Sequence, residues 1–291
     1  MYSTEDLLEM RASGRYPIAN LKIFDDIKRI NLENRTLDNI KYTEEVYIER
    51  INEIMSLDEI VREKYLTKIK AIETADNQSL EKEDPFFIDL YQDLTSETAI
   101  DYLLNNDMNK DTFIEGHKII LKGTSREDLS TVDYRDNNDT YVSMTNTDGE
   151  MEPYYFALDY MDIPEAIDKI VDYYNSNSDK NVFEKPIITH GLIAALQMFN
   201  DGNTRYARLL QYLKIHELTN KIYKTNSDKP LIYGTRSYFP FRENYRSMMS
   251  ELVTNGDSDT WNRWINFNLN RIQDRINYEE PKLERVKTLI K

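Results

Sequence analysis

Between Lys185 and Leu196 the chain is apolar on nearly every side of a helix. Ile, Ala and Leu fill this segment. Pro186 near its start suits a first helical turn, where a missing backbone N–H costs no intrahelical hydrogen bond. A helix without a polar face has to be covered by other elements all around. We therefore expect this helix to be a central, buried element of the fold.

Apolar residues recur at helical spacing along most of the remaining chain. The spacing predicts two or three amphipathic helices between Leu21 and Ala75. Asp111 is a candidate N-cap and Gly123 a candidate stop for a helix between them. The helices after Ala75 are expected at residues 95–104, 110–121, 163–174, 206–215, 242–253 and 261–276. The predicted fold class is mostly α.

The helical pattern is interrupted in two places. Residues 132–153 mix Tyr, Val and Met with Asp, Asn, Thr and Gly, which favours a short β-hairpin or a loop. Residues 74–85 are polar and end in a proline, which is typical of a linker or a long loop. We place a soft boundary there, with residues 1–84 as an N-terminal helical extension and residues 85–291 as the core.

The composition is that of a folded, acidic protein without thiol chemistry. Asp and Glu outnumber Lys and Arg by 52 to 37, and the net charge of -15 argues against nucleic acid as a partner. The chain has no cysteine, which suits a reducing compartment. It has neither a long apolar run nor the basic and apolar regions of a secretion signal at its first residues. We expect a cytoplasmic protein with no membrane partner.

Residues 199–205, Phe-Asn-Asp-Gly-Asn-Thr-Arg, carry the chemistry that an anion site needs. Gly202 allows a close approach of the backbone, the helix that follows presents its positive dipole end, and Arg205 offers forked contacts to phosphate oxygens. Asp201 offers an oxygen ligand for a Mg²⁺ ion that bridges such phosphates. The same residues are also consistent with an ordinary turn, since Asp-Gly-Asn is common in turns and Asp often caps a helix.

This loop resembles the signature of the Fic family, His-x-Phe-x-Asp/Glu-Gly-Asn-Gly/Lys-Arg, which another Arg often follows. The signature would span residues 197–208, and its matching residues are Phe199, Asp201, Gly202, Asn203, Arg205 and Arg208. His190, Ile163-Pro164 and the Lys185-Pro186 helix start also look like the family, so the resemblance covers roughly residues 110–270. It implies a Fic-type (Fido) helical core with a short β-hairpin flap, preceded by the helical extension.

The resemblance implies a site for ATP or another nucleotide together with Mg²⁺. Asp201 would hold the Mg²⁺ ion, and the loop backbone and the arginines would hold the nucleotide phosphates. The residues that bind the nucleotide would be Gly202, Asn203, Thr204, Arg205 and Arg208. Fic proteins move AMP from the nucleotide to a Ser, Thr or Tyr hydroxyl of a target protein, so Asp201 and Arg205 would also be catalytic.

The hairpin would be the flap that aligns the target protein by β-augmentation. Its residues would be Thr140, Tyr141, Val142 and Ser143, followed by Met144. The sequence is equally consistent with an ordinary surface hairpin. Many relatives also carry an inhibitory helix, but residues 79–84 match its motif only in part, and we do not predict autoinhibition.

Two positions depart from the signature. Gln197 stands where the family has its histidine, and Thr204 stands where it has Gly or Lys. In the family that histidine accepts the proton of the target hydroxyl, whereas a glutamine amide neither gains nor loses a proton near neutral pH. Thr204 adds a branched side chain that is expected to narrow the loop.

The three histidines offer no evident replacement for the missing base. His190 lies on roughly the same helix face as Gln197 but in an apolar stretch, which favours a hydrogen-bonded core residue. His117 and His216 lie in separate helices without a paired spacing, so no zinc site is expected. Two functions follow. One is a Fic-like nucleotide-binding protein with slow or atypical transfer of AMP or another phosphate-containing group, and the other is an inactive binding module for a nucleotide or a protein.

Overall fold

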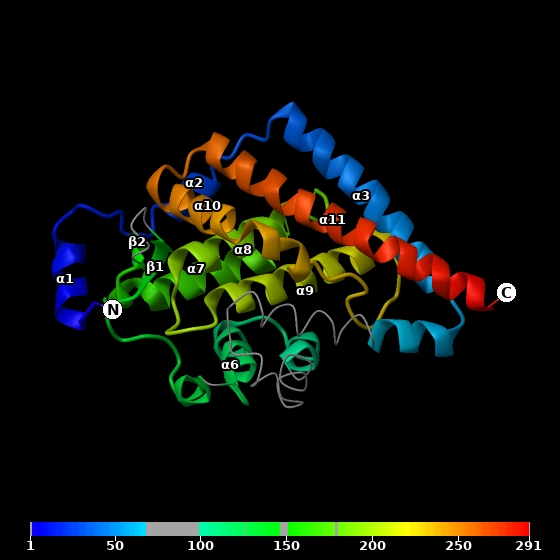
Figure 1. The fold of residues 1–291 in the computed structure, drawn as a ribbon, viewed down its shortest axis with the longest axis horizontal. Helices are drawn as coiled ribbons and strands as arrows, with labels where there is room; N and C mark the ends of the chain where they lie inside the picture. The colour runs from blue at the N-terminus through cyan, green and yellow to red at the C-terminus, as the bar shows by residue number, and fades with distance from the viewer. Residues whose placement is uncertain (1, 68–98, 125, 146–150, 178–179, 291) are drawn as a thin grey trace.

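Helices α8 and α9 form the centre of the fold in the computed structural model, which describes residues 2–67, 99–124, 126–145, 151–177 and 180–290 (Figure 1). α8 spans Glu184–Leu196 and α9 spans Asn203–Tyr223, and they pack against each other more extensively than any other pair of described elements. Every residue of α8 after Glu184 is buried, which confirms the central position that the apolar pattern predicts.

Gly191 explains how α8 can be covered so closely. A Cβ atom at this position would lie 2.8 Å from Nε1 of Trp264 and 2.9 Å from Cζ3 of Trp261, both on α11 (Ser258–Ile290). The indole N–H of Trp264 also donates to the carbonyl of Ile187 on α8 at 2.9 Å. The small residue therefore lets two buried tryptophans anchor the C-terminal helix on the central one.

Further helices surround this pair. α7 (Ile163–Asn175), α10 (Arg242–Thr254) and α11 pack on α8, while α3 (Asn34–Met55) lies along α11 on the outside (Figure 1). α6 (Lys110–Leu121) packs on α7, and its Phe113 carbonyl accepts a 2.6 Å hydrogen bond from the Tyr206 hydroxyl of α9. The other described helical segments are α1 (Thr4–Ala12), α2 (Ile23–Ile27), residues 59–67, residues 99–104 and the 3-10 turns Glu127–Thr131, Tyr160–Asp162 and Thr235–Phe241.

The predicted hairpin is confirmed. β1 (Tyr141–Thr145) pairs antiparallel with β2 (Met151–Phe156), with an irregularity between Val142 and Ser143. An N-terminal segment joins it from the other side of β2. There Ala19 N–H donates to the Phe156 carbonyl and Phe156 N–H donates to the Pro17 carbonyl, both at 2.9 Å.

The amphipathic helices expected between Leu21 and Ala75 are present as α2, α3 and residues 59–67. The proposed boundary and the partial inhibitory motif fall in residues 68–98, outside the described residues. Two details of the helix predictions were wrong. Asn109 and not Asp111 caps α6, because the Asn109 side chain accepts a hydrogen bond from Thr112 N–H at 2.9 Å. α11 also continues beyond its expected end to Ile290, through Pro281.

α3 and α11 meet along a seam of amide and hydroxyl side chains. Asn266 donates to the Thr36 hydroxyl at 2.7 Å, and Gln273 donates to Asn39 and Thr43 at 2.7 and 2.6 Å. These hydrogen bonds fix the register of α3 on α11. None of the described helices is both long enough and apolar enough to cross a bilayer.

Candidate functional site

The loop between α8 and α9 begins and ends with left-handed backbone. Gln197 caps the end of α8 with φ 50°, and Gly202 precedes the start of α9 with φ 75°. Asn203 braces the loop from inside, since its side chain accepts from Phe199 N–H at 2.9 Å and donates to the Phe199 carbonyl at 2.8 Å. The backbone N–H and C=O groups of Phe199 are therefore both hydrogen-bonded, which stabilises the turn that precedes α9.

Asp201 lies at the accessible end of this loop, with 35% of its side chain exposed. Oδ1 accepts a hydrogen bond from Gly202 N–H at 2.5 Å and lies 3.4 Å from Nη2 of Arg205, which is nearly buried. Oδ2 lies 3.3 Å from Nε of Arg126, which is largely exposed. The structure therefore brings together the predicted Asp201, Gly202 and Arg205, and it adds Arg126, which no sequence pattern marks.

His117 on α6 supports the loop. The sequence did not indicate this role. Its ring stacks on Phe199 with the ring centroids 3.6 Å apart and the planes 7° from parallel. Its Nε2 lies 2.8 Å from the Asp201 carbonyl oxygen, which can only accept, so Nε2 carries the proton. Burial lowers the pKa of His117 to about 3, so the ring is a neutral support for the loop and a poor base.

Gln197 is oriented by its own helix. Its side-chain N–H donates to the Ala194 carbonyl in the last turn of α8 at 2.7 Å, and its backbone carbonyl accepts from Nε of Arg135 at 2.8 Å. The side chain is only partly exposed. A neutral amide held in this way can orient a hydroxyl group but cannot remove its proton.

Arg208 lies in the core, with 1% exposure. Its positive charge lies close enough to contribute to the lowered pKa of His190, whose main cause is burial. His190 is hydrogen-bonded to Gln211 through Nδ1 and to the Tyr245 hydroxyl through Nε2 at 2.7 Å, which confirms it as a core residue. Thr204 is partly exposed in the first turn of α9.

The residues predicted to form the flap lie in and beside β1. Thr140 accepts a hydrogen bond from Ala157 N–H at 3.0 Å, Tyr141 is opposite Phe156, and Val142 is buried. Ser143 is opposite Pro153 across the irregularity in the ladder. The hairpin therefore has one side packed into the fold.

Within the described part of the chain, no group of three His, Cys, Asp or Glu side chains could hold a metal ion. A divalent ion at the loop would have Asp201 as its protein ligand, with the remaining ligands from bound phosphate and water. Mg²⁺ is commonly held in this way, because it keeps several waters and uses one or two carboxylates.

Residues 107–215 match the Fic/DOC family model. This segment is similar to the Fic/DOC family. The match covers α6, the hairpin and the whole loop between α8 and α9, so the likeness extends over the segment that holds the candidate site. The likeness also accounts for the helical core with a hairpin beside it.

Solved structures of Fic proteins share the fold over most of this chain. A Fic family protein from Desulfovibrio desulfuricans G20 superposes with a TM-score of 0.59 at 12% identity, covering 87% of this chain and 76% of its own. Fic-1 from C. elegans gives 0.56 at 16% identity, covering 84% and 74%. A Fic domain-containing signaling protein from Bacteroides thetaiotaomicron VPI-5482 gives 0.52 at 18% identity, covering 86% and 94%. A comparison with curated proteins finds no match.

Gly202→Ala is expected to lower stability by about 1–2 kcal/mol through left-handed strain alone. A further loss should come from crowding, because the added Cβ would lie 3.1 Å from Cδ2 of Leu121 and 3.2 Å from Nε2 of His117. Gly14→Ala is the matched control, since Gly14 has φ 71° and nothing within 4 Å of an added Cβ. Urea unfolding should show the larger loss for Gly202→Ala. Equal losses would contradict the tight packing of α6 against the loop.

Proposed function

We propose that this chain binds ATP or another nucleotide with Mg²⁺. It transfers AMP, or another phosphate-containing group, to a protein hydroxyl slowly or by an atypical route. The observation that carries the proposal is the Asp201–Gly202 turn at the start of α9. There a carboxylate, two arginines and the positive end of a 21-residue helix dipole come together. This arrangement suits phosphate groups with a bridging metal ion.

The residues present fit Mg²⁺. The Asp201 carboxylate is a hard oxygen donor with a third of its surface open to solvent. Arg126 and Arg205 balance its charge in this structure and are suited to phosphate oxygens once a metal ion takes that role. A bound Mg²⁺ ion would stabilise the negative charge that develops on the phosphates during transfer.

The slow rate follows from the lack of a general base. Burial lowers the pKa of His117 and His190 to about 3 and that of His216 to about 4, and Gln197 does not titrate. Positioning and charge stabilisation would remain at the loop. We infer that the target is a protein with a Ser, Thr or Tyr hydroxyl, aligned along the flap residues Thr140 to Ser143.

A second candidate is a binding module that transfers nothing. The Gln197 contact with Ala194 favours it, because the amide is held by its own helix. Incubation with labelled ATP, UTP or GTP, Mg²⁺ and lysate separates the two functions. Label on target proteins that disappears with Asp201→Ala supports the slow transferase, and its absence alongside intact nucleotide binding supports the module.

Asp201→Asn is expected to weaken Mg²⁺-dependent nucleotide binding by at least about tenfold, because an amide is a far poorer Mg²⁺ ligand than a carboxylate. Isothermal titration with ATP, UTP and GTP measures the effect with and without Mg²⁺. Asp168→Asn is the control, since Asp168 is also an exposed aspartate in an ion pair, with Lys110 at 3.0 Å. Wild-type protein without Mg²⁺-dependent affinity would contradict the transferase and a nucleotide-binding module alike, and would leave only a module that binds a protein.

A further inference from the structure

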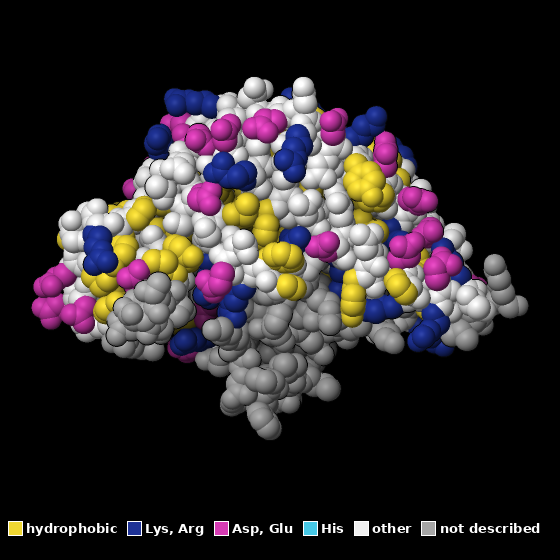
Figure 2. Space-filling view, turned by 45° about the horizontal axis from the view of Figure 1, so that its top comes forward, with side chains coloured by type: hydrophobic (Ala, Val, Ile, Leu, Met, Phe, Trp, Pro, Cys, Tyr) yellow, Lys and Arg dark blue, Asp and Glu magenta, His cyan; other side chains and the backbone are white. Residues whose placement is uncertain are grey.

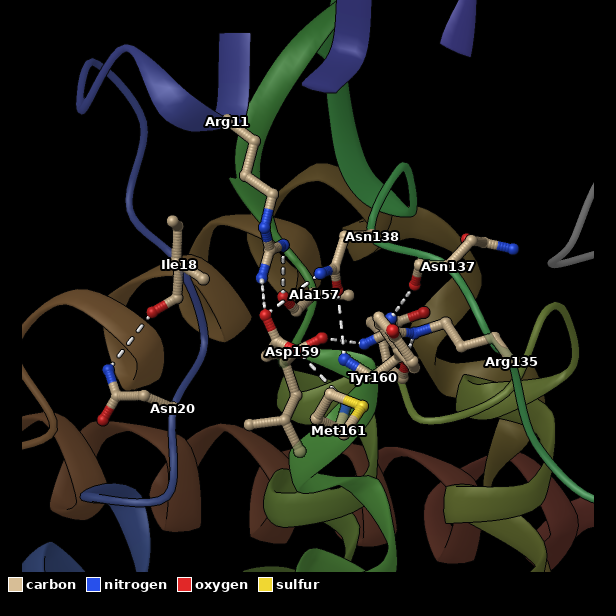
Figure 3. Close-up of polar contacts among 12 residues, drawn as sticks. Arg11, Ile18, Asn20, Arg135, Asn137, Asn138, Ala157, Asp159, Tyr160 and Met161 are labelled. Atoms are coloured by element: carbon tan, nitrogen blue, oxygen red, sulfur yellow. Dashed lines mark hydrogen bonds and ion pairs between the residues drawn. The ribbon is translucent and has the colours of Figure 1, made fainter. Parts of the chain in front are cut away.

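One buried arginine joins three segments of the domain that carry the candidate site. The Arg135 side chain is fully buried, and its guanidinium group donates to three backbone carbonyls (Figure 3). Nε donates to Gln197 at 2.8 Å, Nη1 donates to Asn137, and Nη2 donates to Leu158. Its backbone N–H also donates to the Met198 carbonyl at 3.3 Å.

These partners are the two ends of the flap and the start of the loop. Asn137 precedes β1, and Leu158 follows β2 by two residues. Gln197 is the first residue of the Asp201 loop and has left-handed backbone, which is uncommon for a non-glycine residue. A backbone hydrogen bond from Leu158 N–H to the Leu196 carbonyl at 3.1 Å joins the same segments. Arg135 therefore fixes a strained residue and the flap at once.

Arginine is well suited to this junction, because its N–H donors are spread over three nitrogen atoms. Its guanidinium group has five N–H donors in one plane, whereas lysine has a single ammonium group and glutamine a single NH₂ group. The partners are all neutral, and no ion pair joins Arg135 to any residue in the described part of the chain. Asp159 pairs with Arg11 instead, at 3.9 Å. Burial is the main cause that lowers the pKa of Arg135 to about 10, and the nearby carboxylates of Asp159 and Asp139 oppose this shift.

We propose that Arg135 is a positioning residue that fixes the flap and the Gln197 position as one unit. The proposal rests on the proposed function, in which the flap aligns a target hydroxyl and the loop holds the nucleotide. Burying a cation is costly, and the three carbonyls that Arg135 joins belong to the parts that transfer must hold together. Loss of this junction would uncouple flap and loop without removing any group that contacts the nucleotide.

Arg135→Lys tests the proposal, with Arg275→Lys as the matched control. Arg275 is equally buried but lies on α11 in an ion pair with Glu279. We expect the Mg²⁺-nucleotide dissociation constant to rise about tenfold in Arg135→Lys, as is typical when a residue that supports a binding group is removed. Hydrogen exchange of the β1 and β2 amides should also quicken. In Arg275→Lys both readings should stay at the wild-type value.

Arg135→Ala adds a rescue measurement. Millimolar guanidinium should restore its nucleotide affinity and flap protection, and it should change neither in Arg275→Ala. A folded Arg135→Lys with wild-type nucleotide affinity and wild-type flap exchange would overturn the proposal. Global unfolding of both Arg135 variants without rescue would also overturn it, since Arg135 would then hold the whole fold. If wild-type protein binds no nucleotide, the proposed function fails, and flap exchange with its guanidinium rescue still decides the role of Arg135.

Discussion

Gln197→His is expected to raise the rate of transfer to a protein hydroxyl by roughly 10²–10⁴-fold, the usual contribution of a general base. Imidazole takes up a proton near neutral pH, and the glutamine amide does not. The backbone at this position already has φ 50°, a conformation that histidine adopts more readily than most residues. Transfer of label from ATP to lysate proteins, under single-turnover conditions, measures the change.

Gln197→Asn is the control for this substitution, because it changes the size of the side chain without adding a base. It should leave the rate near the wild-type level. The double variant Gln197→His with Asp201→Ala should lose the gained activity, since the nucleotide would no longer be held with its metal ion. Intact nucleotide binding but no faster transfer in Gln197→His would show that residue 197 does not face the target hydroxyl.

Acidification from about pH 7 to about pH 5 is expected to cost about 2 kcal/mol of folding stability for each of His117 and His190. Burial lowers the pKa of each to about 3, from an ordinary value of 6.5. In the unfolded chain these two histidines therefore take up protons below about pH 6.5, whereas in the folded chain they stay neutral until the pH falls much lower. The stability that these residues contribute is full above that pH and is lost as the pH falls toward 3. Urea unfolding at several pH values measures the loss.

His190→Asn tests the assignment of this effect. The variant should be less stable than wild type near neutral pH, because it loses hydrogen bonds to Gln211 and Tyr245. Its stability should then fall less steeply on acidification, since one buried histidine no longer titrates. Parallel curves for variant and wild type would contradict the burial of His190. Of the described side chains, no histidine is visible on the face shown in Figure 2, in agreement with this burial.

The sequence predicted the elements whose pattern is local. The continuous apolar surface of α8 was enough to predict a buried helix, and the break in helical spacing was enough to predict the hairpin. The helix expected to end at Ile276 continues as α11, although Asn277 and Pro281 just beyond it resemble a helix end. In the structure Glu279 is fully buried against Arg275 on the same helix, so a charged residue occupies a core position. α1 was missed because its mark is a short capping box at Ser3 and Asp6, without a clear apolar face.

The site divides in the same way. The loop from Asp201 to Arg205 could be predicted because turn, glycine and helix start follow one another in the chain. His117 and Arg135 could not, since they reach the loop from 84 and 62 residues away in sequence. Both donate hydrogen bonds to backbone carbonyls, and every residue has a carbonyl, so the sequence pattern does not show which one is bound. Their roles became visible only with the fold.

The pairing of Pro17 to Ala19 with Phe156 also bears on how copies of the chain meet. An open strand edge is a template for pairing with another molecule. The N-terminal segment covers the outer edge of β2, because it takes up both backbone hydrogen bonds of Phe156. A chain shortened past Ala19 would lose this cover, and its hairpins would be exposed to edge-to-edge self-association.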